Sequence, residues 1–304
     1  MVSSKSPKKK RQHHVWQYYL SAWENNGKVQ CWQAGKKIFG TGTKNLGVEA
    51  YFYTLRELSA ADEVLINQLI DRCDVHLRPI AKGWHNVFLT PGKLAKSMGS
   101  WPEVLNSGRS PAELPAEVSE LEEELHCLFE STGKPLLDSL RTGAALSPND
   151  MPRLLPFLTT QYTRTKAVQE RVVDATSGIT ASIWQVMRHV YASNMAMQII
   201  LSGEFKVDVL IAPGELRFIT GDQPIVNAQG IWNPEGRHAT NLELYYPISP
   251  THALLVSKDS SWTKRQVSDV EANIRNATMA RAAHSQVYGQ QVSDLDHVAN
   301  DRRS

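Results

Sequence analysis

The chain has 304 residues, 41% hydrophobic and 21% charged, with a formal net charge of +2; these are globular values, and so balanced a charge does not by itself indicate a nucleic-acid partner. Three scattered cysteines without CxxC spacing argue against a disulfide framework and for a reducing compartment. No apolar run approaches the roughly 20 residues of a membrane span, and no apolar signal segment opens the chain, so we expect a cytoplasmic protein with no membrane partner.

The first residues, 1–12, are expected to be a disordered basic arm. The arm carries Lys8, Lys9, Lys10 and Arg11 immediately before a His-His pair. Such a run is most often a solvated tail, and its alternative reading is a phosphate-seeking arm or a nuclear signal. We expect a single α+β domain over residues 13–289 and a frayed polar tail over residues 290–304.

Short strands are expected at the start of the domain, and helices in its middle. Residues 29–39 contain a polar turn between apolar runs, which predicts two paired strands. Residues 59–202 are expected to be mostly helical, with capped starts at Ser59 and at Ser147.

Breaks and one long helix are expected within this helical region. Breaks are predicted at Pro91-Gly92 and at Gly133 with Pro135. Apolar residues at helical spacing from Ile179 to Leu201 predict a long core helix that ends at Gly203.

The hydrophobic period changes to two after Gly203. Residues 205–213 alternate, and a Pro-Gly-Glu turn then predicts a hairpin with residues 216–220. Two more strands are expected within 242–248 and 252–257, followed by a last helix over about 267–288. The fold class is therefore α+β: short N-terminal strands, a mostly helical middle, a C-terminal antiparallel strand region and a final helix.

Polar residues beside apolar stretches are the candidate site, as expected when distant segments build one site. They are His13, His14, Gln17, Gln161, Arg164, Asp222 and Asn273. Imidazole can act as base, acid or metal ligand, and neighbours on a strand face opposite sides, so one histidine of the pair would serve the site while the other packs. Arg164 follows Gln161 by three residues on an expected helix, and its guanidinium is a candidate clamp for phosphate.

Asp222 and Asn273 have two interpretations each. Asp222 follows an expected strand and precedes Pro224, where a carboxylate could orient a histidine or hold a metal, or could be an ordinary turn residue. Asn273 and Asn276 could place two amides in one pocket, or could cap or solvate the last helix. A divalent metal ion is thus a candidate cofactor, although no ligand set is identified.

A looser pattern joins Arg78 and His85. Their spacing matches the Arg-x(4–6)-His pair of helical ribonucleases that dimerise to form their site. Pro79 and Gly83 argue against the continuous helix that this pair would need, and chance matches to so short a pattern are common.

Several blocks together resemble a large bacterial family of domains of unknown function. The family opens on His-His-x-x-Gln-x-x-Leu, as in HHVWQYYL from His13, and has later Gln-x-x-Arg-Thr and Asp-x-Pro-(Ile/Val) blocks, matched from Gln161 and Asp222. The resemblance covers roughly residues 13–288, with departures at Trp16, where proline is usual, and at Gly221, where serine is usual. It implies a shared fold and names no activity.

We expect an enzyme, and the first hypothesis is a nucleic-acid-acting hydrolase, a nuclease of toxin-like or defence-associated kind with RNA or DNA as its partner. His13 or His14 would be the general base, and Asp222 would orient it or help to hold a metal. Substrate would be bound by Gln17, Gln161, Arg164 and Asn273.

The alternative is a non-catalytic module that binds an anionic ligand, nucleic acid or protein. A third hypothesis makes the polar set a buried hydrogen-bond network that specifies the fold. The oligomeric state is left open.

Overall fold

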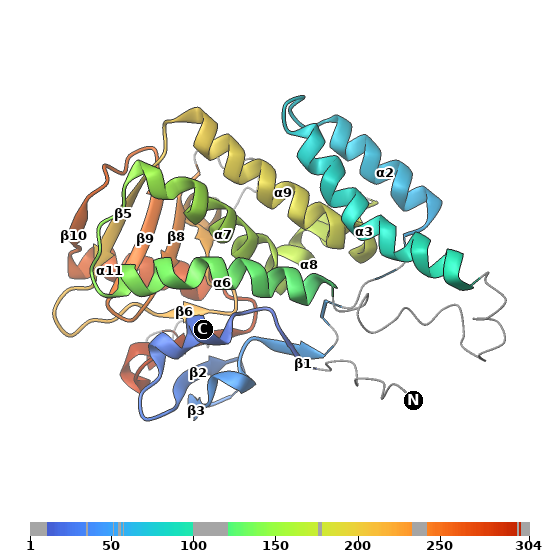
Figure 1. The fold of residues 1–304 in the computed structure, drawn as a ribbon. Helices are drawn as coiled ribbons and strands as arrows, with labels where there is room; N and C mark the ends of the chain where they lie inside the picture. Colours follow the sequence, from blue (N-terminus) through green and yellow to red (C-terminus); the bar gives the residue numbers. More distant parts are fainter. Residues whose placement is uncertain are drawn as a thin grey trace, which may run out of the picture.

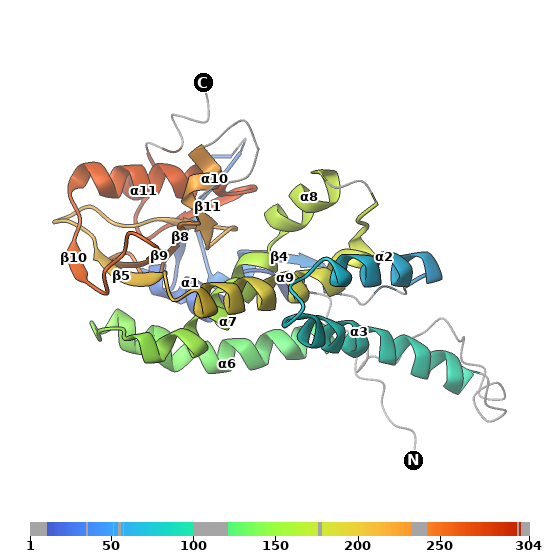
Figure 2. The ribbon, with the colours of Figure 1, turned by 90° about the horizontal axis from the view of Figure 1, so that it is seen from above.

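The computed structural model describes residues 11–99, 121–175, 178–232 and 242–298, apart from positions 35, 51, 54, 55, 57 and 297. Within these ranges the chain has the expected α+β architecture (Figure 1). A five-stranded sheet lies between two helical layers. One layer contains α6 (Leu121–Arg141), α7 (Met151–Thr163) and α9 (Ala181–Ser202). The other is α11 (Asp269–Ala282), on the opposite face (Figure 2).

The five-stranded sheet has the order β10-β5-β9-β8-β7. Its strands are β10 (Lys264–Gln266), β5 (Lys206–Ile211), β9 (His252–Ser257), β8 (Leu244–Pro247) and β7 (Val226–Asn227). Neighbours pair antiparallel except β10 and β5, which are parallel. The expected strands within 242–248 and 252–257 are therefore confirmed as the hairpin β8–β9.

The hairpin predicted between residues 205–213 and 216–220 is wrong. Strand β5 pairs with β9 and β10 instead, and residues 220–221 form β6 in another sheet. The backbone of the 216–220 segment finds other partners: Phe218 N–H donates to Pro250 O at 2.8 Å, and Ile219 N–H donates to Asn276 Oδ1 at 3.0 Å. These contacts between distant segments leave no local trace in the sequence.

A four-stranded sheet joins the two ends of the chain in the order β3-β2-β11-β6. Its strands are β3 (Phe39–Thr41), β2 (Val29–Gln33), β11 (Gln286–Gly289) and β6 (Thr220–Gly221). The pair β2–β3 confirms the two strands predicted over residues 29–39. A separate small pair consists of β1 (Arg11–His13) and β4 (Val48–Ala50), so the last two residues of the predicted arm, Arg11 and Gln12, belong to a strand. Residues 1–10 lie outside the described residues.

The last helix is shorter than predicted. Helix α11 (Asp269–Ala282) ends at Ala282, because residues 286–289 are needed as β11, which pairs with both β2 and β6. The tail prediction also fails in part, since Leu295 and Val298 are buried against the core. The described part of the tail includes the short helix η4 (Val292–Leu295).

The helical middle of the chain is confirmed. It contains α2 (Ala60–Asp71), α3 (Arg78–Gly99), α6 (Leu121–Arg141), α7 (Met151–Thr163), α8 (Lys166–Ala175) and α9 (Ala181–Ser202). The capping box predicted at Ser59 forms, and the helix start predicted at Ser147 is confirmed, because η3 (Pro148–Asp150) and then α7 follow it. The long helix α9 ends at Gly203, whose φ of 65° is the left-handed conformation typical of a glycine helix end.

Shorter elements complete the described chain. They are α1 (Gln17–Leu20), η1 (Ser21–Trp23), η2 (Thr43–Asn45), η3 (Pro148–Asp150) and α10 (Ala228–Trp232). In the described ranges, no helix combines the length and apolar character that crossing a membrane requires.

The predicted helix breaks are wrong. Helix α3 is continuous from Arg78 through Pro91-Gly92, so Arg78 and His85 do lie on one helix. Pro79 is tolerated because it lies in the first turn, where its missing N–H has no intrahelical partner to lose. Helix α6 likewise continues through Gly133 and Pro135. Packing of α6 against α7 outweighs the low helix propensity of these two residues.

Gly133 allows this close packing, because a Cβ atom there would overlap the ring of Phe157 on α7. We expect Gly133→Ala to lower the free energy of unfolding by about 1–3 kcal/mol through overpacking, measured by urea denaturation. Gly83→Ala is the matched control, since nothing lies within 4 Å of its Cβ position on α3. There, alanine is expected to stabilise the protein by about 0.4–1 kcal/mol. Equal changes in the free energy of unfolding for the two variants would contradict the close packing of Gly133 on Phe157.

Candidate functional site

A pocket of about 240 Å³ lies where β1, α1, α6 and the end of α7 come together. It is lined by His13, Trp16, Gln17, Tyr53, Glu123, His126, Cys127, Glu130 and Arg164. Three predicted site residues, His13, Gln17 and Arg164, therefore share one cavity. Gln161 joins them through a contact of 3.3 Å between its Oε1 and Arg164 Nη1.

Arg164 ties the walls of this pocket together. Its Nε donates to Tyr53 Oη at 2.9 Å, and its Nη2 donates to the backbone oxygen of His13 at 2.7 Å. Its Nη1 donates to Glu130 at 2.5 Å as well as to Gln161. These contacts engage four of the five N–H groups of the guanidinium, so the predicted free phosphate clamp is reduced to one N–H. The main role of this buried side chain is to position its neighbours.

His13 presents a neutral imidazole at the pocket. Burial, followed by the charges of Arg11 and Arg164, lowers its pKa, while the bond to Lys44 acts in the opposite direction. Its Nε2 lies 3.3 Å from the Lys44 backbone oxygen, which can only accept, so we assign the ring proton to Nε2. Its Nδ1 then accepts from Gln17 Nε2 at 3.1 Å. Gln17 is exposed, so only a surface amide covers this basic nitrogen.

His14 does not line the pocket. Its buried ring packs on Phe52 with centroids 5.3 Å apart, and its Nδ1 has no hydrogen-bond partner among the described residues. Burial, with the charge of Arg164 next, lowers its pKa to about 3, so it stays neutral. One histidine of the pair thus reaches the pocket and the other packs, which matches the alternation expected along a strand.

Asp222 lies apart from the pocket and holds a turn. Its Oδ1 accepts from the His284 N–H at 2.7 Å, and its Oδ2 accepts from the Ser285 N–H at 2.7 Å and the Gln286 N–H at 2.9 Å. The Ser285 hydroxyl donates to Oδ2 as well, at 2.9 Å. These bonds fix the connection from α11 to β11. The structure therefore corrects the expectation that Asp222 orients a site histidine or holds a metal.

The asparagine pair on α11 does not share a pocket either. Asn273 is exposed, whereas Asn276 is buried and bonds the strand region before β6. Asn276 accepts from the Ile219 N–H at 3.0 Å and donates to the Arg217 oxygen at 2.8 Å. Asn276 is a structural link between two segments. Asn273 does not line the pocket at His13, so the prediction that it binds substrate beside the other site residues is wrong.

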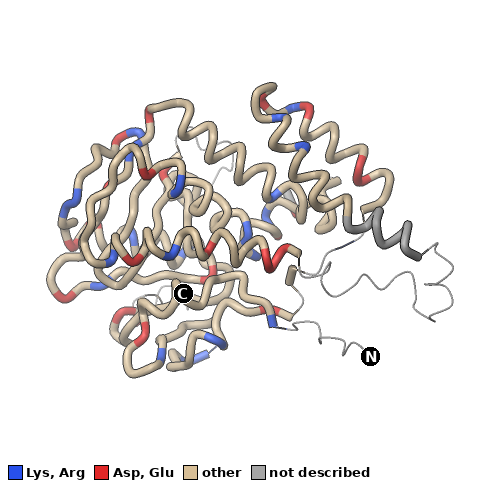
Figure 3. The backbone as a smooth tube through the Cα atoms, viewed as in Figure 1, with Lys and Arg blue, Asp and Glu red and all other residues tan. Residues whose placement is uncertain are grey.

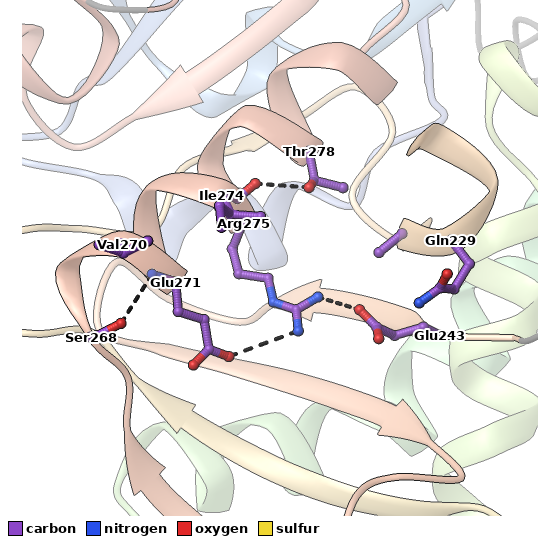
Figure 4. A pocket seen from close by; sticks show the side chains of 9 residues that line it. Gln229, Glu243, Ser268, Val270, Glu271, Ile274, Arg275 and Thr278 are labelled. Carbon is purple, nitrogen blue, oxygen red and sulfur yellow. Dashed lines mark hydrogen bonds and ion pairs between the residues drawn. The ribbon is translucent and has the colours of Figure 1, made fainter. Parts of the chain in front are cut away.

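A second pocket, of about 370 Å³, lies along α11 (Figure 4). Its central cation, Arg275, is paired with Glu243 and, at 3.8 Å, with Glu271. A third, of about 500 Å³, lies beside Trp184. Neither is lined by a predicted site residue, so the pocket at His13 is the candidate site.

The sequence analysis missed a buried cluster beneath the pocket at His13, which we call the Glu-His-His cluster: Glu122, His126 and His189. Glu122 and His126 lie one turn apart on α6, and His189 comes from α9. One ligand atom from each lies within 4.8 Å of the others. Of the three, His126 also lines the pocket, so the cluster reaches the pocket floor through this residue. The sequence signal that could have revealed this cluster is the Glu-x-x-x-His spacing, which places both side chains on one face of a helix. It falls in a run of glutamates at the start of α6 (Figure 3), where solvent exposure is the simpler expectation.

The charge states in the cluster follow from burial and Arg188. Burial favours the neutral form of Glu122, but the Arg188 guanidinium at its Oε2 and the contacts with His126 and His189 together outweigh burial, which holds the pKa of Glu122 well below its usual range. Burial lowers the pKa of His126 and of His189. The cluster therefore presents a carboxylate and two neutral imidazoles, the forms that bind metal ions.

Comparison with known proteins gives one match. A family model described as "Protein of unknown function (DUF4238)" covers residues 11–293. Neither the curated proteins nor the solved structures contain a match. The family description assigns no reaction, so function rests on the pocket and the cluster beneath it.

Proposed function

We propose a function for this chain, which belongs to the DUF4238 family of proteins of unknown function, from the chemistry of its pocket. The chain is a nuclease-type hydrolase that cleaves phosphodiester bonds of RNA or DNA at the pocket shared by His13 and Arg164. The observation that carries the proposal is convergence: residues 151 positions apart, His13 and Arg164, meet at one open cavity and bond each other.

His13 is the general base of this proposal. It is neutral at pH 7, because burial lowers its pKa, and its Nδ1 lone pair is covered only by the amide of Gln17. When substrate displaces that amide, Nδ1 can accept a proton from water or from a ribose hydroxyl. Arg164 positions the base through the His13 backbone oxygen and keeps one N–H for an oxyanion.

Nucleic acid is the substrate class favoured by the chain's own charge. Lys8, Lys9 and Lys10 directly precede the strand that carries His13, and Arg11 is the first residue of that strand. A basic run of this kind draws a polyanion toward the pocket. The cavity is smaller than the roughly 300–1,000 Å³ of drug-sized ligand pockets, which suits one phosphodiester linkage rather than a whole nucleotide. A toxin-like or defence-associated role in the cytoplasm belongs to the same proposal.

His13→Gln tests the general base. We expect it to reduce cleavage of fluorescently labelled single-stranded RNA or DNA by at least about 100-fold, which is the usual contribution of a positioned base. His252→Gln is the matched control, because its ring is half-buried on β9 and bonds Thr251 outside the pocket. The proposal fails if the wild-type protein, assayed with and without divalent metal ions, cleaves neither polymer. It also fails if His13→Gln cleaves as well as the control.

A non-catalytic module that binds an anionic ligand is the second candidate. The engagement of most of the Arg164 guanidinium by protein acceptors favours it, because a structural cation needs no turnover. This candidate predicts that a labelled oligonucleotide binds, as measured by fluorescence anisotropy, and stays intact. Replacing Lys8, Lys9 and Lys10 with glutamine would then weaken binding and reduce its salt dependence.

A further inference from the structure

We propose that Glu122, His126 and His189 bind one divalent transition-metal ion, zinc(II) or iron(II), at the floor of the pocket. Two imidazoles and one carboxylate are the protein ligands of many catalytic zinc and iron(II) sites, in which a remaining coordination position is open to water or substrate. The inference stands on the cluster alone and does not need the proposed hydrolysis.

The spacing of the donor atoms fits a common centre. Three donors about 2.1 Å from one ion, at tetrahedral angles, lie about 3.4 Å from one another. In the cluster, Glu122 Oε1 lies 3.1 Å from His189 Nε2 and 3.5 Å from His126 Nε2. All three donor atoms lie within 4.8 Å, so an ion needs only small side-chain shifts.

His126 supplies an independent observation. Its side chain is 2% exposed, yet its Nδ1 has no hydrogen-bond partner among the described residues, and its Nε2 meets only Glu122 Oε1, at 3.5 Å and without good hydrogen-bond geometry. A buried polar atom without a partner is costly, and a metal bond to Nε2 would remove that cost. The ring itself is held in place by Tyr53, whose centroid lies 4.6 Å away.

The surroundings of the cluster resemble the outer shell of a metal site. Arg188 holds the second oxygen of Glu122, which leaves Oε1 for an ion. Trp84 and Phe88 stack on the ring of His189 with centroids 4.9 and 5.0 Å away. Such packing orients the ligands and keeps bulk water from the ion.

The charge balance indicates what the ion would bind. Arg188 already neutralises Glu122, and an imidazole that holds a metal ion is neutral, so a divalent ion adds two positive charges to the cluster. Of the acidic residues that line the pocket, Glu130 is paired with Arg164, and Glu123 accepts a hydrogen bond from Gln12 at 3.3 Å. The open coordination position therefore favours an anion, and a phosphodiester oxygen is that anion if the proposed function holds.

Metal titration of the full-length protein tests the site. After chelator treatment and dialysis, we expect the protein to bind about one Co²⁺ per chain with visible d–d absorption, and Zn²⁺ to displace it and raise the melting temperature. X-ray absorption of the zinc-loaded and iron(II)-loaded protein should show two imidazole ligands. A protein that binds neither Co²⁺ nor Zn²⁺, or that binds zinc through sulfur, would overturn the proposal.

Variants locate the ion. His126→Asn and Glu122→Gln are expected to weaken Co²⁺ binding by more than the roughly 10–100-fold loss typical of outer-shell changes, whereas His252→Asn should bind as the wild type does. Arg188→Met, which removes only the outer-shell partner of Glu122, should show a smaller loss. Far-UV circular dichroism checks the fold of each variant. If the ligand variants unfold, the absorption spectrum of the wild-type protein still decides. Undiminished binding by folded His126→Asn would refute the site.

The proposed hydrolase activity and the proposed metal site can each be disproved without the other. A protein that binds the ion through two imidazoles but cleaves no nucleic acid removes the hydrolase and keeps the metal site. A protein that cleaves nucleic acid after complete removal of metal, and binds none, removes the metal site and keeps the hydrolase.

Discussion

Arg164→Ala is expected to lower the free energy of unfolding by about 3–5 kcal/mol, the usual cost of breaking a buried ion pair from one side. The change removes the partner of the mostly buried Glu130 carboxylate and also leaves Tyr53 Oη and the His13 carbonyl without their donor. Because these acceptors come from separate segments, the loss affects β1, α6 and α7 together.

Urea denaturation measures this effect, and the chain offers a matched control. Arg153 lies on the same helix, α7, and is exposed, so Arg153→Ala should change stability by no more than about 0.5 kcal/mol. Arg164→Lys keeps the charge but loses the planar fork, and should fall between the two. Equal stabilities for Arg164→Ala and Arg153→Ala would contradict the proposed role of Arg164 as the link between these segments.

Asp222→Ala is expected to cost about 3 kcal/mol, because hydrogen bonds to a charged group contribute roughly 1.5–3 kcal/mol each and several buried donors would lose their acceptor. The affected backbone N–H groups belong to His284, Ser285 and Gln286, which lead into the central strand β11. Thermal and urea unfolding measure the loss. Asp71→Ala, at the exposed end of α2, is the control and should be nearly neutral. Unchanged stability together with loss of cleavage would return Asp222 to a catalytic role.

Local signals account for the parts of the fold that the sequence predicts. Ser59 and Ser147 start helices because each cap bonds a carboxylate three residues later, and Gly203 ends α9 because it adopts a left-handed conformation. The strand β11 has no such signal, since its pairing with β2 joins residues about 250 positions apart. The low helix propensity of glycine predicted a break at Gly133. The helix continues there, because the ring of Phe157 on α7 occupies the space that a larger side chain would need.

The candidate site likewise has residues that local sequence signals predicted and residues that they missed. His13 and Arg164 were predictable as polar residues beside apolar runs, and they do meet at one pocket. Asp222 shows the same pattern for a different reason, because its carboxylate stabilises a turn. Glu122 was missed since it stands in an acidic run that resembles a solvated helix face, although its side chain is 1% exposed. Only the packing of α6 and α9 on the same helix, α7, brings it to His189.

A crystal structure of the zinc-loaded protein with a phosphorothioate dinucleotide tests the central claim most directly, because anomalous scattering at the zinc edge locates the ion. The account predicts one zinc peak among Glu122, His126 and His189, with the phosphorothioate bound in the pocket between that ion, His13 and Arg164. Zinc at another position, or a dinucleotide bound away from this pocket, would contradict it.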